Sequence, residues 1–178
     1  KKKYPKNYKS IFFSNNHQLE RKIKKLKKNY FINFATLYKN NHVYNDIFNF
    51  IKSNILFPTL IYDLISQKAT KVINFGSMMQ HKSSEKFESK NLYSATKNAF
   101  EMISNFYSYK EKNTKFYNLK LYESFGKNDN RKKLIPTIIS NYKTKKTTII
   151  SSKNLELNII HVNDIINALI ILLKNNIK

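Results

Sequence analysis

Apolar positions along this chain follow two patterns that alternate with each other. Short runs that are apolar nearly throughout predict buried strands, and apolar residues that recur every three or four positions predict helices with one buried face. The predicted strands span residues 9–14, 30–35, 72–77, 115–122, 147–150 and 155–162. The predicted helices span residues 18–28, 43–53, 58–65, 93–107, 134–142 and 164–173. Strands that alternate with helices are typical of an α/β fold, in which helices cover a parallel sheet.

A few polar residues and one proline mark the ends of these elements. Asn163 has a side chain suited to an N-cap, and Asp164 adds negative charge at the positive end of the helix dipole. Pro58 suits either the start of a helix or a kink. His161 lies on an apolar strand, where we interpret it as a histidine packed in the core.

The strand at 72–77 and the helix that follows it hold the residues with the clearest chemical potential. The strand ends in Gly76 and Ser77, so it delivers a hydroxyl at its carboxyl end, the edge where open α/β sheets bind ligands. Tyr93 comes sixteen positions after this serine and Lys97 four positions later. Residues four apart share one face of a helix, so we expect the phenol and the ammonium to be neighbours.

This combination suits proton transfer coupled to hydride transfer at a carbon–oxygen bond. A phenol with a pKa near 10 is a poor base, but an ammonium one turn away favours the phenolate and lowers that pKa. Tyr93 would then act as a general acid/base, while the Ser77 hydroxyl holds the reacting oxygen. Lys97 has donors left for a ribose hydroxyl. The competing interpretation is a chance Tyr-x-x-x-Lys pair in a chain with twelve tyrosines and many lysines.

Length and composition predict one globular domain over residues 1–178. Hydrophobic residues make up 41% of the chain, which is enough for a core. The absence of cysteine excludes disulfides and thiolate metal sites and fits a cytoplasmic location. No metal site is expected. The longest apolar run near the end is ALIILL, far short of the ~20 residues of a membrane span, so we expect no membrane insertion.

The net charge of +22 raises a second class of function, a non-catalytic protein that binds nucleic acid or another polyanion. The lysines are spread over the whole chain and accompany an excess of asparagine and isoleucine, as the codons of an AT-rich genome would produce. We therefore interpret most of the charge as a solvated surface and expect no nucleic-acid partner. A basic patch confined to one face would favour the polyanion hypothesis.

Six segments occur in an order that resembles a known family. They are FINFATLY, SNILFPTLIYDLI, VINFGS, YSATK, KLYESFG and IIHVND. Together they resemble the NAD-dependent epimerase/dehydratase family, the extended short-chain dehydrogenases that act on nucleotide sugars. The short spacing from Ser77 to Tyr93 is most similar to sugar-nucleotide reductases of O-antigen dideoxyhexose synthesis, of the CDP-abequose synthase type.

The resemblance implies roles for individual residues. Ser77 would polarise the substrate oxygen, Tyr93 would be the acid/base, and Lys97 would tune Tyr93 and hold the nicotinamide ribose. Further cofactor contacts would come from the backbone of Phe34, Ala35 and Thr36, which would line phosphates and ribose, and from Ser124 beside the nicotinamide.

Substrate contacts follow from the same resemblance. Glu123 stands where many relatives have a substrate-binding asparagine. Arg131, Lys132 and Lys133 would bind the nucleotide diphosphate, or they form a solvated basic loop. Asn54 either touches the substrate or satisfies buried backbone groups.

One family feature is missing from these 178 residues, the glycine-rich turn that holds the cofactor pyrophosphate. The chain has two glycines, Gly76 and Gly126, and neither begins such a turn. The family's adenine-contacting aspartate would fall near Asn15 or Asn16. Residue 1 aligns near the family's third strand, and residue 178 precedes most of the C-terminal substrate lobe. We therefore expect a fragment, a remnant, or a chain completed by something else.

The sequence thus predicts a Rossmann-like doubly wound parallel sheet that lacks the first βαβ unit and most of the substrate lobe. The expected activity is NAD(P)-dependent epimerisation, dehydration or reduction of a nucleotide sugar, with NAD or NADP as cofactor. We expect weak cofactor binding by this chain and a homodimer for a full-length protein. The sequence names neither the sugar nor the reaction subtype.

Overall fold

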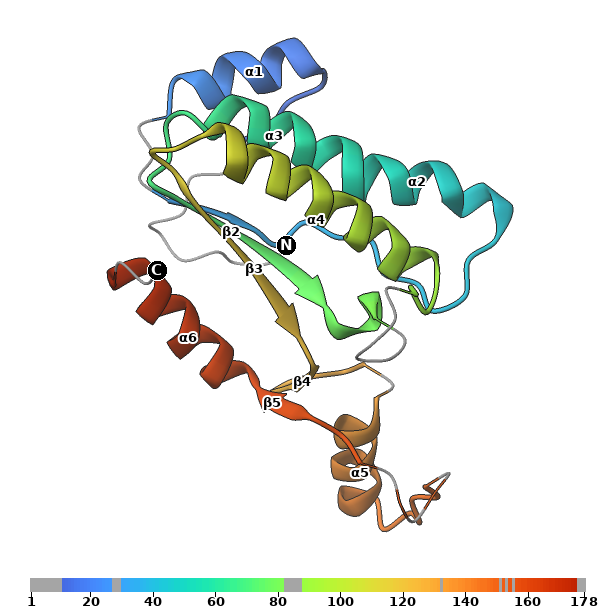
Figure 1. Cartoon of the computed structure of the whole chain (residues 1–178). Helices are drawn as coiled ribbons and strands as arrows, with labels where there is room; N and C mark the ends of the chain where they lie inside the picture. The colour runs from blue at the N-terminus through green and yellow to red at the C-terminus, as the bar shows by residue number, and fades with distance from the viewer. Residues whose placement is uncertain are drawn as a thin grey trace. The chain divides into compact units, whose positions relative to one another are not determined.

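A computed structural model describes residues 11–26, 30–81, 88–131, 133–150, 152, 154 and 156–175 (Figure 1). The chain divides into two compact units, Lys1–Leu119 and Lys120–Lys178, and each is described by itself. Among the described residues, no helix is both long enough and apolar enough to cross a membrane.

The first unit is built on a three-stranded sheet in the order β1-β2-β3. Its strands are β1 (Tyr30–Asn33), β2 (Lys71–Ser77) and β3 (Lys115–Leu121). β1 and β2 are parallel, with Phe31 opposite Val72, and β3 runs in the same direction as β2 in Figure 1. The central strand β2 is buried along its length up to Ser77, as its apolar sequence requires.

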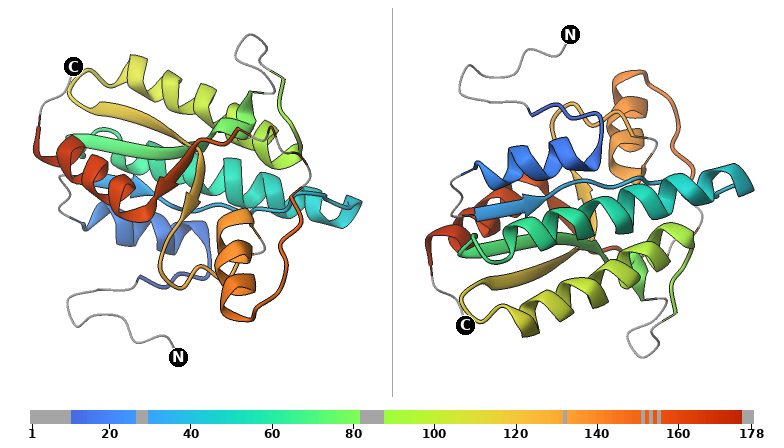
Figure 2. Two further views of the ribbon diagram at one scale, coloured as in Figure 1. Left: turned by 90° about the horizontal axis from the view of Figure 1, so that it is seen from below. Right: turned by 90° about the horizontal axis from the view of Figure 1, so that it is seen from above.

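Helices cover the face of this sheet that points upward in Figure 1. They are α1 (Asn16–Lys24), α2 (Ile47–Ile51), α3 (Phe57–Ile65) and α4 (Leu92–Lys110). Figure 2 shows α3 and α4 side by side over the strands. Their apolar faces meet at Tyr62, whose buried ring lies 4.9 Å from that of Phe100 and 5.9 Å from that of Tyr107. The predicted spacing of apolar residues thus forms the core.

The helix through Asn54 differs from the two separate helices that the sequence predicts. A short 3-10 turn η1 (Tyr44–Asp46) leads into α2, and a π-helical turn η2 (Lys52–Leu56) joins α2 to α3 without a break. Pro58 has no N–H to donate to the carbonyl of Asn54, and the wider turn accommodates that mismatch inside a continuous helix. Pro58 thus lies in the first turn of α3, as predicted for a helix start, but that helix follows on α2 without a break.

Four predicted strands are clearly shorter than expected or absent, and of the described residues 156–162 only 159–161 form a strand. Residues 11–14 and 147–150 form no strand, and Ile149 is 92% exposed, so an apolar run there has nothing to pack against. β1 ends at Asn33 instead of residue 35, because the Asn33 side chain accepts a hydrogen bond from the Ala35 N–H and turns the chain. Residues 9, 10, 27 and 28 lie outside the described residues.

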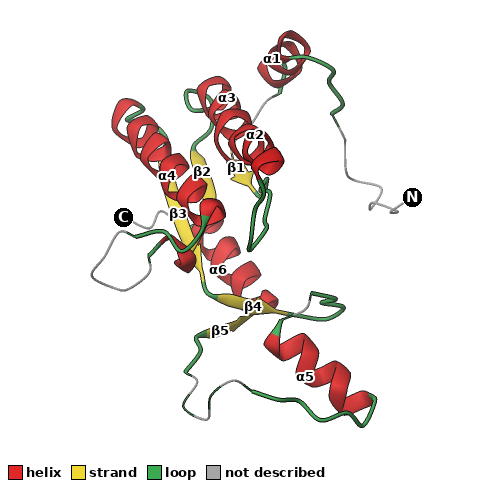
Figure 3. Cartoon of the chain, turned by 90° about the vertical axis from the view of Figure 1, so that its right-hand side faces the viewer, coloured by secondary structure: helices red, strands yellow, loops and turns green. Residues whose placement is uncertain are grey.

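The second unit pairs β4 (Glu123–Phe125) with β5 (Ile159–His161) in parallel and adds α5 (Leu134–Lys143) and α6 (Val162–Lys174) (Figure 3). A Cβ at Gly126 would lie 2.6 Å from Val162 Cγ1, which explains why a residue without a side chain stands at this position.

The predicted N-cap of α6 at Asn163 was wrong. His161 caps α6 by accepting the Asn163 N–H at 3.2 Å, and its ring stands edge-on to Phe125 at 5.1 Å.

A ladder of asparagine side chains crosses the first sheet. Asn33 Nδ2 donates to Asn74 Oδ1 at 3.0 Å, and Asn74 Nδ2 donates to Asn118 Oδ1 at 3.1 Å. Asn118 Nδ2 donates in turn to Asn105 Oδ1 of α4 at 3.4 Å. Asn33 and Asn74 are almost fully buried and lie opposite each other in the β1–β2 register. Each buried amide is therefore satisfied only when the strands are correctly paired.

We expect Asn74→Leu to lower the free energy of unfolding by about 3 kcal/mol, because it leaves the Asn33 amide and the Asn118 carbonyl without partners. Urea unfolding at neutral pH measures this loss. Asn105→Ala at the exposed end of the ladder is the control and should change stability by less than about 0.5 kcal/mol. Equal effects of the two substitutions would show that the ladder contributes nothing.

Candidate active site

Ser77 and Tyr93 meet at the carboxyl end of β2. Ser77 is the last residue of that strand, and Tyr93 lies in the first turn of α4, which begins where the Asn91 side chain accepts the Ser94 N–H at 3.0 Å. The side-chain hydroxyls of Ser77 and Thr36 lie near the Tyr93 phenol and favour its ionised form. Three segments far apart in the sequence thus converge on one phenolic oxygen.

Burial controls the acidity of this phenol. Tyr93 is 9% exposed, and removal from water raises its pKa above the ordinary value, with a smaller rise from Tyr38. Hydrogen bonding with Ser77 and Thr36 opposes that rise. The lowering that the sequence predicted from Lys97 is not found: Lys97 is not among the groups that shift the pKa of Tyr93, and burial sets its direction. The phenol of the free chain is therefore a proton donor at neutral pH.

Lys97 lies one turn after Tyr93 on the same buried face of α4. Its side chain is 4% exposed, and burial lowers the pKa of its ammonium to about 8. Among the described residues it forms no hydrogen bond or ion pair. A buried cation without a partner is costly, and this one keeps three N–H donors available for a ligand.

Asn54 links the loop after β1 to the helix that carries Tyr93. Its amide donates to the Leu37 carbonyl at 3.0 Å and to Thr96 Oγ1 at 2.9 Å, and it accepts the Leu37 N–H at 2.6 Å. Thr96 in turn donates to the backbone carbonyl of Tyr93 at 2.7 Å. Asn54 is 2% exposed, and the π-helical turn directs it inward. Of the two interpretations offered, the structure favours the satisfaction of buried backbone groups.

The proposed cofactor-lining segment forms an extended loop directly after β1. The Ala35 N–H is used internally, by Asn33, and Thr36 Oγ1 donates to Asn54 Oδ1 at 3.4 Å. Phe34 is 66% exposed and stacks on Phe75, with ring centroids 4.9 Å apart. The loop is thus held on one side by amides and presents an exposed aromatic ring on the other.

Two residues next to the site, Tyr38 and Gln80, were not predicted from the sequence. The ring of Tyr38 stands edge-on to Tyr93, with centroids 4.9 Å apart, but Tyr38 lies in a polar loop without a recognisable pattern. Gln80 is fully buried and accepts the Ser77 N–H at 2.7 Å.

A pocket of about 640 Å³ adjoins the turn that follows Ser77. The described residues that line it are Met78, Met79, His81, Glu88, Ser89 and Lys90.

The remaining predicted site residues belong to the second unit, where charged groups pair with one another. Arg131 contacts both oxygens of Asp129, at 2.7 and 2.6 Å, and donates to the Ser124 carbonyl at 2.7 Å. This contact lowers the pKa of Asp129 to about 2. Lys133 donates to Glu123 Oε2 at 2.9 Å. Lys132 lies outside the described residues.

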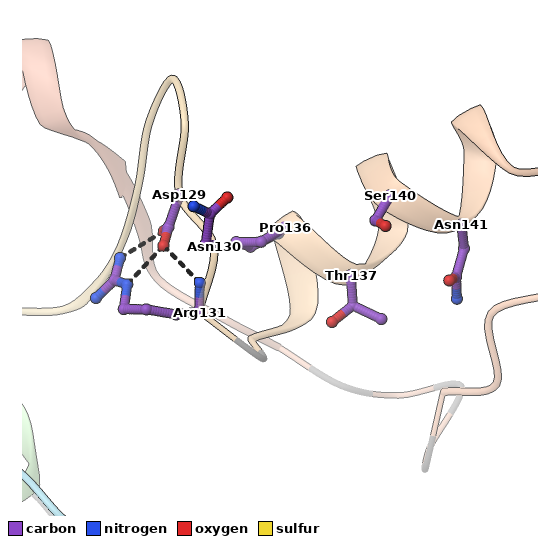
Figure 4. A pocket seen from close by; sticks show the side chains of 7 residues that line it. All are labelled: Asp129, Asn130, Arg131, Pro136, Thr137, Ser140 and Asn141. Carbon is purple, nitrogen blue, oxygen red and sulfur yellow. Dashed lines mark hydrogen bonds and ion pairs between the residues drawn. The ribbon is translucent and has the colours of Figure 1, made fainter.

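A pocket of about 280 Å³ lies beside the pair of Asp129 and Arg131 (Figure 4). Hydroxyl and amide side chains of α5 complete its lining, from Thr137, Ser140 and Asn141. No group of three or more His, Cys, Asp or Glu side chains that could hold a metal ion occurs in the described ranges.

Comparisons with known proteins agree with the fold. The model of the NAD dependent epimerase/dehydratase family matches residues 5–178. CDP-abequose synthase from Yersinia pseudotuberculosis is 29% identical over 147 residues, which cover 82% of this chain and 51% of that protein. The chain therefore spans about half the length of the curated relative that it matches.

Solved structures of two such enzymes superpose closely on the chain. UDP-glucuronic acid 4-epimerase from Bacillus cereus, in complex with UDP-glucuronic acid and NAD, has a TM-score of 0.72 at 15% identity, over 89% of this chain and 53% of that one. dTDP-glucose 4,6-dehydratase from Bacillus anthracis, in complex with NAD, has a TM-score of 0.70 at 18% identity, over 92% and 53%. The parallel α/β sheet predicted from the sequence is confirmed as the fold of these proteins.

Replacing Lys97 by methionine should stabilise the chain in a pH-dependent way. Because folding lowers the pKa of Lys97 from 10.5 to about 8, the cost of burying its charge is fully present below pH 8. The unfolded state binds more protons between the two values, so this cost disappears as the pH rises. We expect Lys97→Met to raise the free energy of unfolding by roughly 3 kcal/mol at neutral pH, with no gain near pH 11.

Urea unfolding of both proteins across this pH range measures the difference. Lys110→Met, at the half-exposed end of α4, is the matched control and should show no such trend. A constant difference between Lys97→Met and the parent chain at all pH values would contradict the buried charge.

Proposed function

The chain belongs to the NAD dependent epimerase/dehydratase family, and from this premise we propose that it is an NAD(P)-dependent enzyme that epimerises, dehydrates or reduces a nucleotide sugar. The observation that supports the proposal most is the approach of Ser77 and Thr36 to the phenol of Tyr93, with the buried ammonium of Lys97, which pairs with no described residue, one turn away. A protein that only binds polyanions has no need for such a group, so the site favours the enzyme over that alternative.

The residues of the site suit a proton transfer at the sugar oxygen. Tyr93 donates its phenolic proton to a keto oxygen in the reductive direction and takes it back from the hydroxyl in the oxidative direction. The Ser77 hydroxyl donates a hydrogen bond to the same oxygen and holds it in reach. Bound nicotinamide would supply or accept the hydride. The Lys97 ammonium, one turn away on the same helix, would stabilise the phenolate that remains after the proton has been given up.

The described residues fit one half of such a cofactor better than the other. Lys97 offers three donors for ribose hydroxyls, and the loop at Ala35 and Thr36 lies next to Tyr93, as a ribose contact requires. For the pyrophosphate, these 178 residues offer no glycine-rich turn. We therefore propose that the ribose and nicotinamide ends bind here and that the chain alone binds the whole cofactor weakly.

We also propose separate contacts for the two parts of the sugar nucleotide. We assign the sugar to the pocket of Met78, Met79 and Lys90, because that pocket follows directly on Ser77 and its volume is typical of ligand sites. We assign the diphosphate to Arg131, Lys132 and Lys133, of which Lys132 lies outside the described residues, and we assign Glu123 to another part of the substrate. Phosphate oxygens would then replace Asp129 on the Arg131 guanidinium. The field of a chain with net charge +22 would attract such an anion.

The 29% identity to CDP-abequose synthase supports a finer proposal, a role in making sugars of surface polysaccharides such as O-antigen. The lack of cysteine in the 178 residues agrees with action in the cytoplasm. Reductase, epimerase and dehydratase all use a proton acceptor of this kind.

We also propose that two copies associate through the outer face of α4. Five apolar residues form one stripe on its exposed side, about 21 Å long at the helical rise. They are Ala95, Ala99, Met102, Phe106 and Tyr109. The helix carries two lysines only, the buried Lys97 and the terminal Lys110. Two copies of so basic a chain repel each other wherever lysines face, so an uncharged apolar stripe is where a second copy can approach.

Nicotinamide fluorescence titration tests the enzyme proposal. We expect NADH or NADPH to bind the chain weakly, with a dissociation constant on the order of 1 mM, because the pyrophosphate contacts are few. Lys97→Ala should remove most of this binding. Tyr93→Phe is the matched control and should leave binding within about twofold while lowering any turnover by roughly 10² or more. Binding that is indifferent to Lys97→Ala would contradict the assigned site.

Sedimentation velocity tests the proposed dimer. Phe106→Asp places a charge in the middle of the α4 stripe and should shift a dimer to monomer, because burying an unpaired carboxylate is costly. Tyr142→Asp alters a still more exposed aromatic residue, on α5, and should leave the dimer intact. Dissociation by both variants, or a monomeric parent chain, would contradict this interface.

A further inference from the structure

The turn after β2 is organised around a buried glutamine that none of the roles above requires. Residues Met78–Gln80 form a 3-10 turn, η3, directly after Ser77. Gln80 is 0% exposed, so both ends of its amide need partners inside the protein. The described contacts satisfy both ends.

The oxygen of this amide acts on Ser77. Gln80 Oε1 accepts the Ser77 N–H at 2.7 Å, while Ser77 Oγ accepts the Met79 N–H at 3.2 Å. The serine is therefore held at its backbone by Gln80, and one lone pair of its hydroxyl is occupied by the turn. The hydroxyl hydrogen remains free to point at Tyr93 or at a substrate oxygen.

The nitrogen of the same amide acts on α4. Gln80 Nε2 donates to Asn98 Oδ1 at 2.9 Å and to Glu101 Oε2 at 2.6 Å. Asn98 returns a hydrogen bond to the Gln80 carbonyl at 2.8 Å and donates to Ser89 Oγ at 2.8 Å. Asn98 follows Lys97 in sequence, so the amide joins the serine strand to the helix of the other two site residues.

From this geometry we infer that Gln80 is a positioning residue, which fixes the distance and direction between the Ser77 hydroxyl and the Tyr93 phenol. The alternative is that Gln80 only stabilises the fold, as any satisfied buried amide does. The two differ in one respect. A positioning residue changes the hydrogen bonding of Tyr93 when it is replaced, whereas a purely structural one changes stability alone. The inference rests on the proposed role of Ser77 and Tyr93, but its test needs neither cofactor nor substrate.

The test is NMR of the whole chain with tyrosine labelled with ¹³C at the ring carbon that bears the hydroxyl. The Tyr93 signal is identified by its loss in Tyr93→Phe, and Ser77→Ala shows how far it moves when the serine is removed. We expect Gln80→Leu to move the Tyr93 signal in the same direction and by at least half as much as Ser77→Ala does. We also expect Gln80→Leu to raise the pKa of Tyr93, because the hydrogen bond that favours the phenolate is lost.

Thr114→Val is the matched control. Thr114 is 6% exposed and donates its hydroxyl to the Ala69 carbonyl at 2.6 Å, just before β3 begins. Its replacement removes a buried hydrogen bond of the same kind and should lower the melting temperature without moving the Tyr93 signal. A Gln80→Leu spectrum with Tyr93 unmoved, or a Thr114→Val spectrum in which it moves equally, would overturn the inference. An unmoved signal in Ser77→Ala would overturn it as well.

A second pair of variants keeps the test decisive if Gln80→Leu does not fold. Gln80→Glu retains the acceptor for the Ser77 N–H but sets a carboxylate against Glu101, so it should displace the turn and move the Tyr93 signal. Adding Glu101→Gln supplies an amide donor again and should return the signal at least halfway to its original position. Failure of the double variant to restore the signal counts against Gln80 as the link. A chain that passes this test yet binds no NADH would refute the proposed function alone.

Discussion

The pairing of Asn33 with Asn74 ties the register of the first unit's sheet to a buried hydrogen bond. Two buried amides face each other across parallel strands, and the Asn33 Nδ2 donor is paired with the Asn74 Oδ1 acceptor. A slip of one residue would separate this donor from this acceptor and turn the apolar side chains of β1 to the wrong face. The same register fixes where β1 ends and where β2 delivers Ser77. The geometry of the candidate site therefore depends on a hydrogen bond between residues that take no part in its chemistry.

The site itself combines groups that are unfavourable when buried alone. Removal from water raises the pKa of Tyr93 and lowers that of Lys97, so both groups are shifted toward their neutral forms. Neither shift stabilises the fold. Helix α4 tolerates this because its other buried residues, such as Phe100 and Tyr107, pack against Tyr62 and anchor the helix. The stable packing of one half of the helix thus supports a strained electrostatic arrangement in the other half.

The sequence predicted the elements whose apolar pattern is strong and missed those set by single side chains. β2, α3 and α4 lie where their runs and repeats placed them, because burial decides their structure. The spacing of Tyr93 and Lys97 was equally readable, since one helical turn relates them. The cap at His161 was not, because an imidazole nitrogen replaced the expected asparagine. The edge-on contact of Tyr38 also had no pattern to reveal it, because it is made by a loop.

The π-helical turn at residues 52–56 has a consequence for the comparison of this helix with those of other proteins. A π turn holds about one residue more than an α turn of nearly the same length, so it shifts the phase of every side chain after it by about 100°. The face that α2 presents and the face that α3 presents therefore belong to two different helical repeats within one continuous rod. A relative with a plain α-helix here would need one residue fewer to span the same distance. In an alignment of the two sequences, a gap of one position in this helix would then mark a rotation of the following side chains about the helix axis. The length of the helix would stay the same.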